Sequence, residues 1–163
     1  MATEQVAVRQ GDLALLDDPV AQKLLHSTQP AHLAYTWWDG TPRVVPIWFE
    51  WNGAEFVLGT PPNAPKVAVL QENTHVSLEI DSAEWPYKVL IIRGSAHVEV
   101  VDGVSAEYAA AAARYFGPEQ GPAWVGQVGQ MFSKMARIVV RPDWVGIPVA
   151  GIQRLIEEAA ETA

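Results

Sequence analysis

The stretch that decides the fold is Arg43–Gln71, which runs RVVPIWFEWNGAEFVLGTPPNAPKVAVLQ. β-Branched and aromatic residues dominate its first half and flank Asn52-Gly53, a dipeptide typical of a two-residue hairpin turn. Three prolines then end the strand pattern, and Lys66–Glu72 has the composition of a short helix. This order predicts two paired strands, over 43–51 and 55–60, followed by a loop and a helix.

The segments on either side extend this pair of strands. Residues 31–37 predict a strand that Asp39-Gly40, a second hairpin signal, joins to strand 43–51. Pro46 indicates that strand 43–51 lies at a sheet edge or carries a bulge, because proline cannot donate a ladder hydrogen bond. Residues 74–81 alternate polar and apolar side chains, as a half-buried strand does.

Later segments complete a small barrel. Residues 87–101 predict a long strand in which Gly94 marks a bulge or a close backbone approach. Helices are predicted within 13–27 behind an Asp17 or Asp18 cap, over 104–116 with a stop at Gly117-Pro118, and over 123–135. The last strands are predicted at 136–141 and 144–147, broken by Pro142-Asp143. A meander that continues after a helix crossing predicts a mainly β fold with helices, a barrel of about six strands.

Composition limits the classes of function. At 163 residues the chain suits one domain over 1–163, with a core at about 13–147 and a tail at 148–163. It contains no cysteine, which excludes disulfides, thiolate catalysis and cysteine-ligated metal centres. A net charge of −8 argues against non-specific binding to nucleic acid or anionic membranes. With no signal-peptide core and no bilayer-length apolar run, we expect a cytoplasmic protein.

The common catalytic motifs do not occur. H-E-x-x-H, G-x-S-x-G, G-x-x-x-x-G-K-[ST] and G-x-G-x-x-G are all missing, which disfavours zincins, α/β-hydrolases, P-loop proteins and Rossmann folds. The four histidines, His26, His32, His75 and His97, are scattered without ligand spacing. The sequence therefore predicts no metal site.

Lys66 falls in the first turn of the helix predicted after the proline loop. A cation there opposes the helix dipole unless an anion neutralises both. A phosphate held by Lys66, the Thr60 hydroxyl and free amides around Asn63–Val67 would be such an anion. The alternative is a solvent-exposed lysine without a ligand, and the residues themselves do not decide between the two.

Arginine and tryptophan give two further signals. Arg93 lies in an apolar strand, KVLIIRG, where a buried guanidinium needs a partner. We expect it either to pair with Glu79 or Glu50 or to face a ligand phosphate or carboxylate. The chain has seven tryptophans, and adjacent pairs such as Trp37 and Trp38 must face opposite sides of a strand. Some of these rings should therefore meet another subunit or line a flat aromatic ligand.

Five motifs follow one another within residues 20–147, the part of the chain that the resemblance covers: R43-V-V-P-I-W-F-x-W-x-G-x-x-F-x-L-G-T60, P65-K66-V-x-x-L70, T-H-V-S-L-E-I-D81, P86-Y-K-V-L-I-I-R-G94-S-A and R137-I-V-V-R-P-D-W144. Their ordered series resembles the pyridoxamine 5′-phosphate oxidase-like superfamily of flavin- and deazaflavin-dependent oxidoreductases. The resemblance implies a six-stranded antiparallel split β-barrel of the FMN-binding type. It also implies a homodimer with two cofactor sites at the subunit interface.

Carried over onto this sequence, the resemblance implies cofactor-binding residues Arg43, Val44, Val45, Pro46, Ile47, Thr60, Asn63, Lys66, Lys88, Arg93 and Trp144. Thr60 and Lys66 match the positions that bind the cofactor phosphate. Residues 44–47 match the strand whose backbone lies along the isoalloxazine ring. Lys88 and Arg93 fall in a strand that supplies basic groups near the cofactor, and Trp144 in a segment that reaches the partner's site.

The implied function is hydride transfer between FMN and a small planar substrate. The Arg-x-His signature of true pyridoxamine phosphate oxidases is replaced by Arg141-Pro142-Asp143-Trp144, so oxidation of vitamin B6 is not expected. The deazaflavin F420 is the alternative cofactor; its acidic tail favours a basic groove, for which this acidic chain offers few residues. No catalytic residue is assigned. The alternatives from other classes are a non-catalytic flavin-binding or sensor module and a dimeric barrel without a cofactor.

Overall fold

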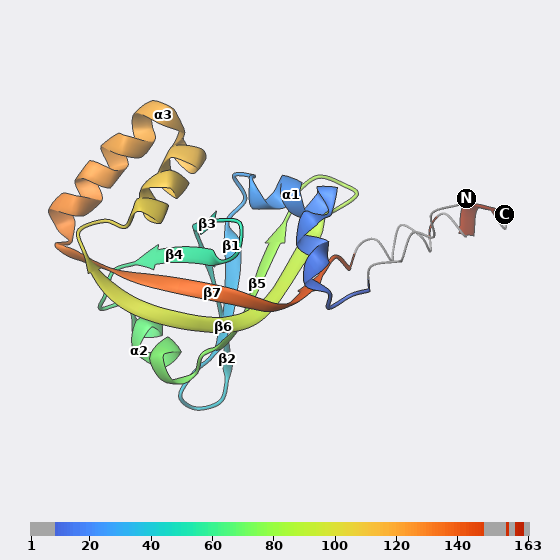
Figure 1. Cartoon of the computed structure of the whole chain (residues 1–163), viewed down its shortest axis with the longest axis horizontal. Helices are drawn as coiled ribbons and strands as arrows, with labels where there is room; N and C mark the ends of the chain where they lie inside the picture. Colours follow the sequence, from blue (N-terminus) through green and yellow to red (C-terminus); the bar gives the residue numbers. More distant parts are fainter. Residues whose placement is uncertain (1–8, 149–155, 157–158, 162–163) are drawn as a thin grey trace.

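The computed structural model describes residues 9–148, 156 and 159–161, and almost all of the tail predicted at 148–163 lies outside them. One antiparallel sheet contains the strands β1 (Ala31–Thr36), β2 (Pro42–Ile47), β3 (Phe49–Trp51), β4 (Phe56–Thr60), β5 (His75–Asp81), β6 (Val89–Asp102) and β7 (Lys134–Gly146). Around it lie the 3₁₀ helix η1 (Leu13–Asp17) and the helices α1 (Pro19–Leu25), α2 (Pro65–Glu72) and α3 (Ala106–Met131) (Figure 1).

A single residue connects the two edge strands of the sheet and so brings the edges near each other. Its strand order is β2-β1-β5-β6-β7-β4-β3, so β2 and β3 are its two edges. Trp48 alone joins the end of β2 to the start of β3. The sheet must therefore curl until its edges approach, although β2 and β3 share no hydrogen-bonded ladder. This is the geometry of a split barrel, and it confirms the predicted fold class.

The inner face of the curled sheet forms the core. Leu33, Leu78 and Ile92 lie on neighbouring strands and are fully buried. Phe49 and Phe56 are also fully buried, with ring centroids 5.8 Å apart. Alternation along β5 confirms the pattern predicted for residues 74–81, since every second side chain is buried.

Two short helices add apolar side chains to this core. Asp18 caps α1 by accepting a hydrogen bond from the Val20 amide at 2.8 Å, and Pro19 occupies the first turn, as predicted. Leu24 of α1 and Leu70 of α2 are buried in the same cluster as the sheet residues. Both helices therefore help to fill the barrel.

The long strands β6 and β7 pair over almost their whole length, with one irregularity. The register shifts between Arg93 and Gly94, so that Arg93 lies opposite Trp144 and Gly94 opposite Pro142. A Cβ atom at Gly94 would come within 2.1 Å of the Arg141 carbonyl oxygen. The predicted bulge at Gly94 is confirmed, and the close approach explains why glycine stands there.

Helix α3 covers the end of the sheet that carries β3 and β4 (Figure 1). Trp48 stacks on Tyr115 with ring centroids 4.8 Å apart and meets Phe116 edge-on at the same distance. Gly117, with φ of 87°, separates the helix into two arms, which confirms the predicted stop at Gly117-Pro118. The second arm begins directly after Gly117 and not at residue 123, where the sequence predicted it. No helix in the described part of the chain is long and apolar enough to cross a membrane.

Three details differ from the sequence prediction. The described residues form seven strands rather than six, because the strand predicted at 43–51 is divided at Trp48 into two sheet edges. The segments predicted at 136–141 and 144–147 form one strand, since the bulge opposite Gly94 accommodates Pro142. The second arm of α3 ends at Met131, so Lys134 and Met135 belong to β7 rather than to a helix over 123–135.

Arg114 attaches α3 to the barrel. Its guanidinium donates to the Glu50 carboxylate, to the Phe49 carbonyl and, at 3.0 Å, to the Ser27 carbonyl. The Arg114 and Glu50 side chains are only 17% and 25% exposed. We expect Arg114→Ala to lower the free energy of unfolding by about 2–4 kcal/mol, because a half-desolvated carboxylate and a carbonyl lose their donors.

Urea denaturation would measure this loss, with Arg141→Ala as the matched control. Arg141 pairs with Glu55 but is 78% exposed, so its loss should cost less than about 1 kcal/mol. Equal effects of the two substitutions would contradict the anchoring role of Arg114.

Candidate functional site

The outer face of the sheet carries the predicted cofactor strand. Because residues directly opposite each other share a face, the ladders align Val44, Ala34, Ser77, Arg93 and Trp144 in one row across five strands. Their sequence neighbours in the strands point mainly into the core, and this row points outward. Val44 is 65% exposed, which is unusual for a valine in a strand. The row therefore crosses an outer face that the barrel core does not need.

A cavity of about 420 Å³ lies along this row. Five strands contribute to its lining, which includes Thr36, Pro42, His75, Ser77, Arg93 and Asp143. It combines hydroxyl groups, an imidazole, a guanidinium and a carboxylate with apolar surface. Such a mixture is typical of a site that holds a small polar or aromatic molecule.

Arg93 differs from the sequence prediction of a buried arginine. Its side chain is exposed, and the guanidinium lies 4.1 Å from the centre of the Trp144 ring. Neither expected partner binds it, because Glu50 pairs with Arg114 and Glu79 with His32. The bulge at Gly94 lets the chain present Arg93 and Trp144 side by side. Within the described residues Arg93 has no ion pair, so its charge is available to a ligand.

Lys66 and Thr60 lie on either side of the proline loop. Thr60, at the end of β4, is 6% exposed and borders a separate cavity of about 210 Å³ with Tyr108 and Trp124. Lys66 is half-buried in the first turn of α2, and no carboxylate within the described residues forms an ion pair with it. Burial lowers the pKa of its ammonium group below the ordinary value of 10.5.

Among the described residues, the start of α2 has one unused backbone donor, the Lys66 amide, because the Val67 amide already donates to the Ala64 carbonyl at 2.9 Å. Its N-cap residue, Ala64, provides no side-chain hydrogen bond to the first turn, and Pro65 has no amide proton to satisfy. Asn63 is exposed in the loop directly before it. A free backbone amide beside a half-buried lysine without an ion pair among the described residues is the kind of arrangement that can bind an anion.

The structure places the remaining predicted residues in different surroundings. Residues 44–47 belong to β2, which pairs with β1 on one side and with no other described strand. Arg43 donates to the Thr41 hydroxyl and lies 5.4 Å from the centre of the Trp37 ring, within the hairpin. Lys88 lies beside Lys23, whose hydrogen bond and positive charge lower the pKa of Lys88.

Sequence reasoning did not identify Ser77 and Asp143 as members of the site. Ser77 donates to the Ile92 carbonyl at 2.9 Å, and both Ser77 and Asp143 line the cavity beside Arg93. The alternation in residues 74–81 already indicated that Ser77 points away from the core. Asp143 reaches the cavity because of the bulge between β6 and β7. This bulge depends on the pairing of two strands that are far apart in the sequence, so the residues around Asp143 do not predict it.

Comparison with known proteins gives one family and several structural relatives. The family model described as pyridoxamine 5′-phosphate oxidase matches residues 18–147. A search of curated proteins found no match to the sequence. Among solved structures, an F420 reductase is 29% identical, with a TM-score of 0.61 over 77% of this chain and 94% of that chain.

Two further solved structures share the fold. A conserved hypothetical protein from Mycobacterium tuberculosis gives a TM-score of 0.63 at 19% identity, over 88% of each chain. The heme storage protein HutZ from Vibrio cholerae gives a TM-score of 0.59 at 16% identity, over 80% of this chain and 93% of that chain.

We expect Lys66 to lose its proton at a lower pH than an ordinary lysine, because burial disfavours the ammonium form. A bound phosphate favours the ammonium form, so it should raise this pKa again. Affinity for a phosphate-bearing ligand should then fall as the pH rises through the pKa of Lys66. A pH titration of reductively ¹³C-methylated lysines by NMR, with Lys66→Arg to assign the signal, measures both effects. A Lys66 pKa at or above 10.5 without ligand would contradict the desolvated environment assigned to this side chain.

Proposed function

Because the chain belongs to the pyridoxamine 5′-phosphate oxidase-like family, we propose that it is an oxidoreductase that binds a phosphorylated flavin or deazaflavin cofactor. The residues at the start of α2 carry this proposal. Lys66 is half-buried and has no ion pair among the described residues, and the adjacent helix start is uncapped. A protein gains nothing from desolvating a lone cation, but a bound phosphate would offset that cost.

The edge strand β2 suits the ring of such a cofactor. Half of the backbone amides and carbonyls of an edge strand point away from the sheet and can bind a ligand. The exposed Val44 and Pro46 offer apolar surface beside these groups. We propose that residues 44–47 hold the ring while the Lys66 side chain and amide and the Thr60 hydroxyl hold the phosphate.

We propose F420 ahead of FMN, the cofactor expected from the sequence. The F420 reductase is 29% identical and 94% of its length is covered, whereas the other two structures are only 19% and 16% identical. Arg93, and Lys23 and Lys88, which lie beside each other, have no ion pair in the described part of the chain, so they can meet an acidic tail. FMN is the second candidate, because a net charge of −8 disfavours a polyanionic ligand.

The protein's own groups would bind and orient the substrate. FMN or F420, when bound, supplies the hydride chemistry. Arg93, held over the Trp144 ring, can pair with a carboxylate or with a developing negative charge on a substrate. Ser77 and His75 line the same cavity and offer hydrogen-bonding groups to a small planar molecule. The proposed substrate is therefore a small planar compound with an anionic or electron-poor group.

We also propose that the chain acts as a homodimer. The outer face that carries β2 exposes Val44, and the adjacent hairpin exposes Trp38, which is 50% exposed. A second subunit placed there would bury both side chains and enclose the cavity beside Arg93. The dimer would thus complete the cofactor site from two chains.

The alternative is a non-catalytic module that binds a cofactor without turnover. The fold similarity to a heme storage protein gives this alternative weight. Absorption spectra of the protein with FMN, F420 or haem, followed by assays of cofactor reduction and reoxidation, separate the two. When an electron donor for the bound cofactor is supplied, an enzyme should reduce an electron acceptor over many turnovers. A storage module should bind one equivalent of the cofactor per chain and show no turnover.

Lys66→Ala provides the main test of the proposed function. We expect it to weaken binding of the preferred cofactor about tenfold to a hundredfold, the value of a charge-assisted hydrogen bond of about 1.5–3 kcal/mol. Quenching of flavin or deazaflavin fluorescence during titration with protein measures the affinity. Lys66→Arg should retain most of it, because the positive charge is kept.

Arg141→Ala is the matched control, since it removes one positive charge from an exposed side chain that is paired with Glu55 and is not assigned to the cofactor. It should leave the affinity for FMN and for F420 within about twofold of the wild type. The phosphate assignment would be wrong if both alanine variants bound as tightly as the wild type. The cofactor proposal itself would fail if the wild-type protein bound neither FMN nor F420.

A further inference from the structure

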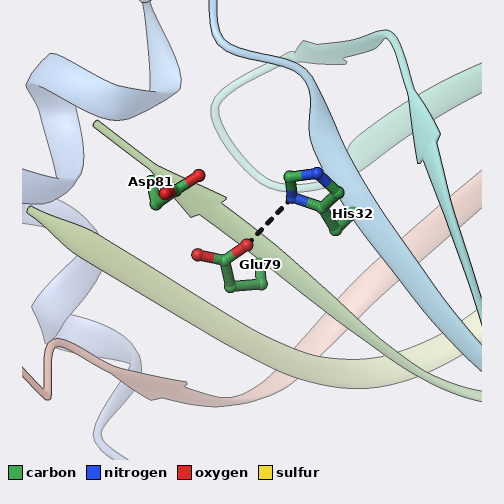
Figure 2. Close-up of side chains that lie close together, drawn as sticks. All are labelled: His32, Glu79 and Asp81. Carbon is green, nitrogen blue, oxygen red and sulfur yellow. Dashed lines mark hydrogen bonds and ion pairs between the residues drawn. The ribbon is translucent and has the colours of Figure 1, made fainter. Parts of the chain in front are cut away.

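A second polar cluster lies on the outer face of the sheet, near the C-terminal end of β5. Figure 2 shows His32 of β1 beside Glu79 and Asp81 of β5. One ligand atom from each of the three side chains lies within 4.8 Å of the other two. All three residues are half-buried, so the cluster is neither fully solvated nor part of the core.

The strand register fixes this arrangement. His32 lies directly opposite Glu79 in the β1–β5 ladder, and Asp81 follows Glu79 by two residues on the same face. Leu78 and Ile80, on either side of Glu79 in the strand, point inward and are fully buried. A register slip would expose these two side chains to water, so the three polar groups are held on the outer face.

The charges of the cluster are not balanced by the protein. Nδ1 of His32 lies 3.0 Å from Oε2 of Glu79, but the Asp81 side chain has no hydrogen bond or ion pair among the described residues. The ligand atoms of Glu79 and Asp81 lie on the same face of β5 and within 4.8 Å of each other, so the two negative charges repel each other. Two carboxylates and a neutral imidazole together match the charge of a divalent cation.

We propose that His32, Glu79 and Asp81 bind a divalent transition-metal ion, with Zn²⁺ as the best fit. One imidazole and two carboxylates suit Zn²⁺, whereas Mg²⁺ and Ca²⁺ prefer oxygen ligands alone. Tetrahedral Zn²⁺ needs ligand atoms roughly 3.5 Å apart. Rotation of the half-exposed carboxylates can close the present spacing without moving the backbone. Three protein ligands leave a fourth position for water or another ligand.

The proposed metal site lies beside β2, the strand proposed to hold the cofactor ring, but metal binding does not require the cofactor. His32 lies opposite Pro46 of β2 on one side and opposite Glu79 on the other. A metal ion here would link β1 to β5 next to the strand proposed to hold the ring. Its binding can be measured without FMN, F420 or a substrate, so the test is separate from that of the proposed function.

The test is a titration of the untagged, full-length protein with Zn²⁺ after removal of metals by EDTA and dialysis. We expect one ion per chain by isothermal titration calorimetry, with a higher melting temperature when Zn²⁺ is present. His32→Ala and Asp81→Asn should each weaken binding by more than about tenfold, since even outer-shell changes cost that much. Substitution with Co²⁺ should give the visible absorption bands of a low-coordinate site in the wild type and not in these variants.

His97→Ala is the matched control, because His97 is an exposed histidine on β6 outside the cluster. It should bind Zn²⁺ like the wild type, while circular dichroism confirms that every variant is folded. Asp81→Asn keeps the test valid if His32→Ala is unstable, because the Asp81 side chain has no hydrogen bond or ion pair to lose within the described residues. Unchanged Zn²⁺ affinity in both cluster variants, or no binding by the wild type, would overturn the proposal.

Discussion

The closure of the sheet at Trp48 is the constraint on which the rest of the structure depends. β2 and β3 are opposite edges of one sheet, yet a single residue connects them. The sheet must curl, and the curl encloses a core that includes Phe49, Phe56 and Leu33. The same residue binds α3, because its indole stacks on Tyr115. With α3 placed on the β3–β4 end of the sheet, the outer face around the other edge is left for binding.

The net charge of −8 does not show that some cationic side chains form ion pairs within the protein while others do not. Arg114 and Arg137 are committed to carboxylates: the first holds α3 to Glu50, and the second bridges Glu99 and Glu107. Lys66 and Arg93 have no ion pair in the described part of the chain. One lies at a helix start and the other at a sheet bulge, where backbone geometry rather than an opposing charge determines their position. An acidic protein can in this way present local cationic sites to a phosphorylated ligand.

Local signals predicted much of this fold. Asp39-Gly40, the cap at Asp18, the alternation in β5 and the bulge at Gly94 each depend on a few neighbouring residues, and the structure confirms all four. The division of strand 43–51 could not be predicted in the same way. Nothing near Trp48 shows that the chain passes there from one sheet edge to the other, because that depends on pairings with β1 and β4 far along the chain.

The positions of some residues of the candidate site, but not of others, could be predicted from the sequence. The position of Lys66 in the first turn of a helix was predicted, and the structure places it there, half-buried and without an ion pair among the described residues. The exposure of Arg93 did not follow, because the bulge that aligns it with Trp144 needs both long strands. The His32–Glu79–Asp81 cluster was missed for the same reason, since its ligands come from strands that pair over a long sequence separation.

A crystal structure of the protein with F420 or FMN bound would examine the proposed cofactor site directly. We predict the cofactor phosphate within about 3 Å of the ammonium group and the backbone amide of Lys66. We also predict the ring along β2, on the outer face shared with Arg93. A cofactor bound with its phosphate away from Lys66, or with its ring on the α3 side of the sheet, would contradict the assignment of both residues to the cofactor site.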